Sequence, residues 1–205
     1  MTFPPLNKLY DPKCTLCPLH ANVEHVCIPS SGATDKFKCL VVGEAPGRYE
    51  DEQNTPFVGR SGWLLDRELN RAFQVDNARV LIPVTNAVKC RPSDPDGKYN
   101  HTPEYPDIVA CVDAYLTHEI YTLDARVILA LGNVAAQALL DTTGIAMLRD
   151  SWHALSMQDK IRRQRWVRVT YHPAYVLRQG LDSKVARQFR EDVQIFAETV
   201  KKEAE

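Results

Sequence analysis

Three short stretches of the sequence place side chains that can bind ligands next to residues that form turns. The first, VVGEAPGRYEDEQNTPFVGRSG at residues 41–62, runs from an apolar segment into a bend rich in Gly and Pro, followed by several acids and Phe57. The second, VTNAVKCRP, carries Asn86, and the third, HPAYVLR, begins with His172. An amide both donates and accepts hydrogen bonds, and an imidazole can donate one toward developing negative charge. Taken singly, the three residues also fit structural roles: a loop anchor, a turn that closes a strand and a packed histidine.

The cysteines form a second group of residues with chemical potential. There are six of them: Cys14, Cys17, Cys27, Cys39, Cys90 and Cys111. The CTLC pair lies in a loop flanked by prolines and can hold one metal, with Cys90 and Cys111 as candidates for two further ligands. Cys39 reads as a core residue, and the role of Cys27 stays open. Four thiolates suit zinc or an iron–sulfur cluster; one close pair plus two distant single cysteines favours iron–sulfur, with unrelated buried thiols as the alternative.

The elements that must position these residues alternate between strands and helices. Apolar, β-branched segments predict strands at 38–43, 79–84, 126–131 and 166–171. Helical spacing predicts helices at 61–73 (with Ser61 as N-cap), 104–122, 133–140 and about 183–203, and residues 91–106 read as a loop. This alternation predicts an α/β fold: a three-layer α/β/α sandwich with a central, mainly parallel four-stranded sheet.

The three ligand-binding stretches share one place in this predicted fold. GEAPG follows the first strand, TNAVKCRP the second and HPAYVLR the last. Ligands of open parallel sheets bind at the carboxyl ends of the strands. We therefore expect the three stretches to converge on one crevice.

Length and composition limit the class of protein. The 205 residues suit a single domain over 1–205, in which a cysteine loop at about 10–30 contributes to the metal site. Neither an apolar run of the ~20 residues that span a bilayer nor an apolar leader at the N-terminus is present, so we expect no membrane contact and a reducing cytoplasm. The net charge of −1 gives no overall nucleic-acid signature. Basic runs at 88–92, 160–168 and 176–190 offer local basic faces, or are simply solvated surfaces.

Taken together, these motifs resemble those of a known protein family. GEAPGRYEDEQNTPFVGRSGWLL, VTNAVKCRP and YHPAYVLR resemble the family 4 uracil-DNA glycosylases, the iron–sulfur branch of the uracil-DNA glycosylase superfamily. The resemblance runs from CTLC to the last helix and includes ACVDAYL, GNVAAQALL and LRDSW. It implies a DNA repair enzyme that removes uracil from DNA and leaves an abasic site. It also implies a four-iron four-sulfur cluster on Cys14, Cys17, Cys90 and Cys111, and we expect a monomer.

The resemblance also assigns roles at the crevice. The base must leave the duplex to be reached. Phe57 is expected to stack on the flipped base, and the Asn86 amide to pair with uracil N3–H and O4 and so to reject cytosine. His172 is expected to donate a hydrogen bond to uracil O2 as charge builds there. The backbone amides of Glu44 and Ala45 are expected to approach a uracil carbonyl.

The attacking water and the DNA backbone need further residues. Better-known branches of the superfamily carry an Asp where Ala45 stands, so another acid must handle the water. We favour Glu50, with Glu44 as its rival and Asp51 as a neighbour that could assist; a solvated acidic loop is the alternative. The expected DNA contacts, made as a wedge or to phosphates, are Lys89, Arg91, Tyr175, Leu177 and Arg178. Leu177 could instead pack beneath the sheet edge.

The chain departs from the family pattern at a few positions. Asp150 and Asn54 stand where Gly is common, and the segment between Cys90 and Cys111 is somewhat enlarged. None of these departures removes a residue assigned to the chemistry. Two other functions compete with the glycosylase: a weakly active or inactive DNA- or partner-binding protein with the same cluster, and a zinc-stabilised hydrolase acting on another nucleotide.

Overall fold

The computed structural model describes residues 9–32, 36–156 and 164–204. The strands are β1 (Cys39–Gly43), β2 (Val84–Asn86), β3 (Val127–Leu131), β4 (Trp152–Ala154) and β5 (Trp166–Thr170). The helices are α1 (Arg48–Gln53), α2 (Arg60–Phe73), α3 (Tyr105–Cys111), α4 (Thr117–Thr122), α5 (Asn133–Leu140), α6 (Ile145–Leu148), α7 (Pro173–Gln179) and α8 (Lys184–Glu203). Short 3₁₀ turns at Pro18–Asn22 and Ala78–Val80 and a π turn at Val112–Leu116 complete the described elements.

The strands form one sheet in the order β2-β1-β3-β5-β4. The first four strands of this order are parallel, and β4 pairs with β5 in the antiparallel direction, with Trp152 opposite Arg168. The expected α/β fold is confirmed, but the sheet has five strands where four were predicted. The missed strand is three half-exposed or exposed residues long, too short to show the alternation by which a strand is recognised.

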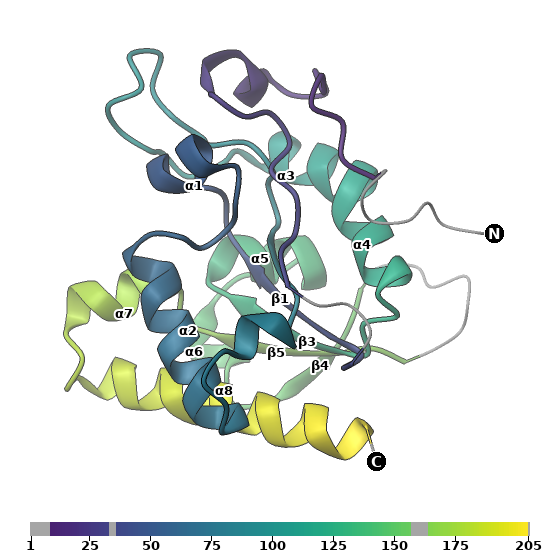
Figure 1. Ribbon diagram of the computed structural model, residues 1–205, viewed down its shortest axis with the longest axis vertical. Coiled ribbons are helices and arrows are strands. Elements are labelled where there is room, and N and C mark those ends of the chain that lie inside the picture. The colour runs from purple at the N-terminus through teal and green to yellow at the C-terminus, as the bar shows by residue number, and fades with distance from the viewer. Residues whose placement is uncertain (1–8, 33–35, 157–163, 205) are drawn as a thin grey trace.

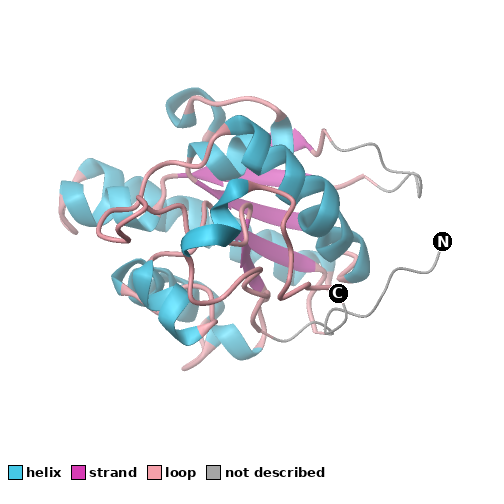
Figure 2. Cartoon of the chain, turned by 90° about the horizontal axis from the view of Figure 1, so that it is seen from above, coloured by secondary structure: helices cyan, strands magenta, loops and turns pink. Residues whose placement is uncertain are grey.

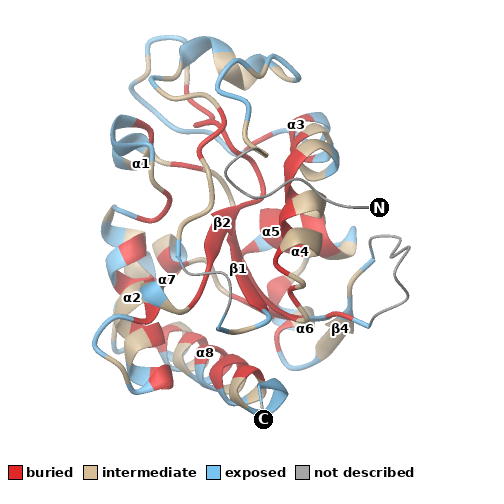
Figure 3. Ribbon diagram, turned by 45° about the vertical axis from the view of Figure 1, so that its right-hand side comes forward, coloured by how far each residue is buried: buried red, intermediate tan, exposed pale blue. Residues whose placement is uncertain are grey.

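Alternate residues of the central strands β1 and β3 enter two separate cores, which makes the protein three layers thick (Figures 1 and 2). Leu40 and Val42 of β1 face the side covered by α3, α4, α5 and α6. Cys39 and Val41 face the side covered by α2, α7 and α8. β1 and β2 are buried along their whole length, as parallel strands covered on both faces should be (Figure 3). Cys39 is therefore a core residue, as its position in the sequence indicates.

Several predicted boundaries differ from those of the structure. The segment expected as a strand at 79–84 is mostly a 3₁₀ turn and a loop, and β2 begins only at Val84. Asn54 ends α1 with φ of 49°, a left-handed conformation that Gly and Asn accept most readily. The helix expected at 104–122 contains a π turn between α3 and α4. Gly59, not Ser61, is the N-cap of α2.

None of the helices within the described ranges is long and apolar enough to cross a bilayer, and a cytoplasmic location stays a prediction.

Asp192 of α8 joins strand β5 to the segment that carries Arg149. Its carboxylate lies fully buried and accepts hydrogen bonds from Arg168 at 2.6 Å, from Thr170 at 2.8 Å and from Arg149 at 3.2 Å. Burial raises the pKa of Asp192, and the hydrogen bonds from Arg168 and Thr170 oppose that rise. The basic run at 160–168 starts outside the described residues, and its described arginines, Arg165 and Arg168, are buried, so this part is not a basic surface.

Removal of the Asp192 carboxylate should be strongly destabilising. Asp192→Ala leaves two buried guanidinium groups without their shared counter-charge, and we expect the free energy of unfolding to fall by about 3–5 kcal/mol. Asp150→Ala is the matched control, because Asp150 pairs with the same Arg149 at 2.7 Å but is exposed. That control should cost about 1 kcal/mol or less. Urea unfolding of both variants tests the prediction, and equal losses would contradict it.

Candidate active site

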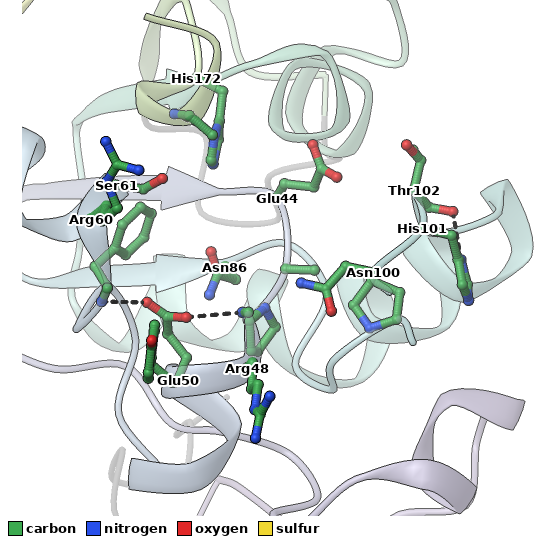
Figure 4. Close-up of a pocket in the computed structure, with 18 of the residues that line it drawn as sticks. Glu44, Arg48, Glu50, Arg60, Ser61, Asn86, Asn100, His101, Thr102 and His172 are labelled. Carbon is green, nitrogen blue, oxygen red and sulfur yellow. Dashed lines mark hydrogen bonds between the residues drawn. The ribbon is translucent and has the colours of Figure 1, made fainter. Parts of the chain in front are cut away.

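A cleft of about 600 Å³ opens at the carboxyl ends of β1, β2 and β5 (Figure 4). The three stretches expected to converge do so, since each contributes to its lining. The predicted site residues among the lining are Glu44, Ala45, Glu50, Phe57, Asn86, His172 and Arg178. In Figure 4, Asn86, Glu44 and His172 surround the same space from different segments of the chain.

Phe57 and Asn86 meet at Gly43, the last residue of β1. A Cβ on Gly43 would lie 2.4 Å from the Phe57 ring and 2.5 Å from Asn86 Oδ1, so only glycine leaves room for both groups. Phe57 has φ of 58°, a left-handed conformation that is unusual for an aromatic residue and costs energy. Gly62 makes this turn possible, because a Cβ there would lie 1.8 Å from the Phe57 carbonyl oxygen. The local backbone is thus built to place one ring beside one amide.

His172 caps the N-terminus of α7 and presents one ring nitrogen to the cleft. Its Nδ1 accepts a hydrogen bond from the Ala174 backbone N–H at 3.2 Å. In a neutral imidazole the proton then lies on Nε2. Burial, and secondarily the nearby charge of Arg178, lower the pKa of His172 to about 4. The ring is therefore a neutral donor at physiological pH.

Both carboxylate oxygens of Glu50 are occupied by backbone donors. Oε1 accepts from Gly59 N–H at 2.8 Å, and Oε2 accepts from Gly47 N–H at 3.1 Å (Figure 4). The two glycines flank the acid: Gly47 is the N-cap of α1, and Gly59 precedes α2. Glu50 therefore joins the bend after β1 to the segment that carries Phe57. The neighbouring Asp51 is buried and also accepts backbone hydrogen bonds, so it does not enter the cleft.

Glu44 and Ala45 lie where β1 enters the bend. The carbonyl groups of Gly43 and Glu44 accept hydrogen bonds from Ala87 and Val88, which fixes this bend against the segment after β2. The Glu44 carboxylate lines the cleft, and no hydrogen bond among the described residues uses its oxygens. Burial raises the pKa of Glu44, while Arg178 acts in the opposite direction.

A wall of the cleft that the sequence did not predict comes from residues 92–102. Asn100, His101 and Thr102 line the cleft on the opposite side of Figure 4 from Arg60 and Ser61. The segment is folded back on itself by a bridge between Ser93 and Asn100 and a hydrogen bond from His101 N–H to the Pro92 carbonyl. The sequence could have indicated this wall, because the loop starts at the same sheet edge as the three stretches that line the cleft.

The basic residues after β2 do not lie where a phosphate could reach them. Lys89 is 1% exposed and pairs with Glu119 at 2.6 Å. Arg91 is buried beneath the 92–102 segment, where Nε donates to the Asn100 side chain at 2.6 Å and Nη2 donates to the Gly97 carbonyl at 2.8 Å. The prediction that these two residues contact DNA does not fit the geometry, because buried, paired cations cannot approach a polyanion.

Most of the HPAYVLR stretch forms helix α7, an element that the sequence analysis does not predict. Tyr175 and Arg178 are exposed on it, and the Arg178 guanidinium lies 5.8 Å from the centre of the Tyr175 ring. Leu177 is half-buried and packs against the core beside α8, which agrees with the structural alternative for this residue and argues against a wedge. Arg48 and Arg60 are further exposed cations at the cleft that the sequence did not single out.

Five of the six cysteines, all except Cys39, lie close to one another beside the π turn. Cys17 and Cys111 share a side-chain hydrogen bond, and the N–H of Cys27 donates to Cys90 Sγ at 3.4 Å. Burial raises the pKa of Cys90. The charges of the nearby Cys17, Cys27 and Cys14 raise it further, whereas the hydrogen bond from the Cys27 backbone lowers it. The four predicted ligands are therefore neighbours, drawn from the N-terminal loop, the segment after β2 and α3.

The thiols do not form a closed ligand set as they stand. Within the described residues, no three His, Cys, Asp or Glu side chains lie close enough together to hold one metal ion. The donor set is nevertheless chemically suited to an iron–sulfur cluster, which needs four thiolates and spaces them more widely than a single ion does. Tyr115, in the π turn, hydrogen-bonds to Cys14 and Cys27, so the helix distortion faces the cysteines.

Comparison with known proteins confirms the family that the sequence motifs resemble. The family model described as uracil DNA glycosylase superfamily matches residues 29–196. The type-4 uracil-DNA glycosylase of Pyrobaculum aerophilum is 36% identical over 199 residues, covering 93% of this chain and 92% of that protein. The protein of the same name from Thermotoga maritima is 34% identical, with 93% and 91% covered. The one from Saccharolobus solfataricus is 33% identical, with 80% and 73% covered. The chain therefore belongs to the uracil DNA glycosylase superfamily and, within it, to the type-4 uracil-DNA glycosylases.

Proposed function

We propose that this protein is a DNA repair enzyme that hydrolyses the N-glycosidic bond of uracil in DNA, after rotating the nucleotide out of the helix. The observation that carries the proposal is that Phe57, Asn86 and His172 line one cleft at the ends of three strands. A flipped base needs a stacking surface, a partner for its polar edge and a donor for the charge that develops as it leaves. The cleft supplies one residue of each kind.

Phe57 and Asn86 would recognise the base. The ring packs on the same glycine as the amide, which allows the base to lie against the ring with its edge toward Asn86. The amide donates to uracil O4 and accepts from N3–H. Cytosine presents a donor at position 4 and an acceptor at N3, so it would meet like groups and leave buried polar atoms unpaired, which is costly.

His172 would stabilise the departing uracil. Negative charge spreads to the O2 carbonyl as the glycosidic bond breaks, and the Nε2–H of His172 is free to donate to it. The Ala174 N–H fixes the ring in the required tautomer, and the lowered pKa of His172 keeps the ring neutral. A fixed donor in a site shielded from water lowers the barrier, because it needs no reorganisation during the reaction.

Glu44, rather than Glu50, would orient the attacking water. Glu50 uses both oxygens to hold backbone N–H groups, so its role is to position the bend and Phe57. The Glu44 carboxylate faces the cleft. When ionised it could accept a hydrogen bond from the water and offset the cationic character of the sugar. This reverses the preference drawn from the sequence.

The DNA strand would cross the rim of the cleft. The exposed residues Tyr175 and Arg178 of α7, and the exposed Arg48 and Arg60 that line the cleft, are the groups placed to meet phosphates and an unstacked neighbouring base. Such contacts give affinity without sequence preference, as an enzyme that scans DNA requires. We propose that the protein acts as a monomer, because a single copy supplies Phe57, Asn86 and His172 and the proposed reaction needs no residue from a second copy.

We also propose that Cys14, Cys17, Cys90 and Cys111 hold a four-iron four-sulfur cluster. The support is that these thiols gather from three distant segments, and that none of the six cysteines is tied up in a disulfide. When bound, the cluster would cross-link those three segments. The residues themselves order the N-terminal loop against α3 and the segment after β2.

Loss of either polar group in the cleft should remove activity without unfolding the protein. We expect Asn86→Ala and His172→Ala each to lower kcat on a uracil-containing oligonucleotide by about 100- to 1,000-fold. His153→Ala is the control, because His153 lies on β4 and bonds to the Leu148 carbonyl. Cleavage at the abasic site measures the rate. Full activity in both cleft variants would refute the site, and an inactive wild type that still binds DNA would indicate a binding protein instead.

Replacement of the two acids should have different effects. Glu44→Gln should lower kcat by about 100-fold or more and leave the free energy of unfolding within about 0.5 kcal/mol of wild type. Glu50→Gln should lower the free energy of unfolding by about 1–3 kcal/mol, because an amide cannot accept from both backbone donors. Urea unfolding and single-turnover cleavage separate the effects. A stable but inactive Glu50→Gln beside an active Glu44→Gln would restore Glu50 as the group that orients water.

The cysteine site should bind a coloured cluster. Anaerobically purified protein should be brown, with broad visible absorption and about four irons per chain. Cys17→Ala should lose the colour, whereas Cys39→Ala, in the core strand β1, should keep it. Colourless protein that contains zinc would show that the four thiolates hold the other metal.

A further inference from the structure

A buried group of polar side chains lies directly beneath the base-recognition side of the cleft. Its centre is the ion pair of Lys89 and Glu119, whose side chains are 1% and 0% exposed. Lys89 Nζ donates to Glu119 at 2.6 Å, to the Thr85 hydroxyl at 2.6 Å and to the Asn86 carbonyl at 2.7 Å. Glu119 also accepts from Thr85 at 2.9 Å and from the hydroxyl of Tyr10. All three protons of the ammonium group therefore have an acceptor.

Stability alone does not account for this arrangement. Removal of two charges from water costs several kcal/mol per ion, and well-packed apolar residues of the same volume often serve a fold as well or better. The clearest gain from a buried ion pair is a fixed geometry.

One side of the group fixes Asn86. Lys89 bonds to the Asn86 carbonyl and to the side chain of Thr85, so it holds the last two residues of β2. The next residue, Ala87, donates its N–H to the Gly43 carbonyl at 2.9 Å, on the strand where the Phe57 ring and the Asn86 amide meet. The backbone that carries the Asn86 amide is thus held by two sets of hydrogen bonds. One comes from Lys89 and the other from Gly43 of β1.

The other side of the group fixes the N-terminal cysteine loop. The Tyr10 hydroxyl bonds to Glu119 and to Ser30, whose backbone N–H returns a hydrogen bond at 2.9 Å. Tyr10 also stacks on Tyr115, the π-turn residue beside the cysteines, with ring centres 6.4 Å apart. Tyr10 and Ser30 lie near the two ends of the loop that contains Cys14 and Cys17.

We propose that the Lys89–Glu119 pair is the positioning group of uracil recognition, and that Tyr10 couples it to the cysteine loop. The pair sets the direction of the Asn86 amide, and the loop keeps the pair in place. The proposal rests on the proposed function, because it assumes that Asn86 reads the base. It assigns to Lys89 a role in base selection rather than in DNA binding.

Three variants test the proposal on the holoprotein. Lys89→Met removes the cation and leaves Glu119 unpaired, so it is accompanied by the double variant Lys89→Met/Glu119→Leu, which leaves no buried charge. Tyr10→Phe removes one hydroxyl only. We expect the two Lys89 variants to lower kcat by about 10- to 100-fold, the effect of misplacing a reacting or binding group by a fraction of an ångström to one ångström.

The remaining measurements separate positioning from a general loss of structure. The inhibition constant of free uracil should rise by a factor similar to the fall in kcat, while KM for DNA and the affinity for uracil-free duplex stay unchanged. Tyr10→Phe should shift the same two quantities in the same direction by a smaller factor. Glu68→Gln is the control: it alters a buried carboxylate that pairs with Arg67 on α2, and should leave uracil binding unchanged.

Two results would overturn the proposal. One is a folded double variant with wild-type kcat and wild-type inhibition by uracil; the other is a loss of DNA affinity equal to the loss of kcat. If Lys89→Met fails to fold, the double variant and Tyr10→Phe still decide the matter. An inactive wild type would instead refute the proposed function, so the two failures can be told apart.

Discussion

The cleft depends on a missing side chain at the end of β1. Gly43 is the point where an aromatic ring from the loop before α2 and an amide from β2 come together, and a methyl group would overlap both. The sheet brings β1 and β2 side by side in register, with Gly43 opposite Asn86. The meeting of ring and amide, which we propose recognises the base, is thus a consequence of strand pairing: two neighbouring strands end at the same level, and one of them ends in the smallest residue.

The loops around this point are held by backbone hydrogen bonds to side chains, in addition to the apolar packing of the buried Phe57 ring. Glu50 joins the two glycine N–H groups that flank the Phe57 segment, and Gly62 admits the strained turn at Phe57. On the other side, Ala174 N–H orients the His172 ring. Strained and tightly bonded backbone of this kind is typical of sites that must be in place before the ligand arrives.

Much of this arrangement was predictable from the sequence, because it follows from local patterns. Helix α5 begins and ends where predicted, and β1, β3 and β5 agree to within a residue or two. The strands β1 and β3 are continuous apolar runs, as buried parallel strands should be, and β5 alternates apolar with polar residues. The convergence of Glu44, Asn86 and His172 followed from strand ends, whereas the place of Phe57 followed from the resemblance to the family. What failed depended on partners distant in sequence. Lys89 reads as a surface cation until Glu119 is seen beside it, and Glu50 reads as a free acid until two glycine amides are found on it.

The fold-back at 92–102 separates the width of the cleft from its chemistry. This wall is held by Arg91 and by hydrogen bonds within the segment, whereas the groups that we propose react are carried by the sheet and its adjoining turns. Insertions or deletions there would resize the chamber while leaving the ring, amide and imidazole untouched. Evolution could therefore alter which damaged nucleotides are admitted by editing one surface segment, at little cost to the framework that performs the cleavage.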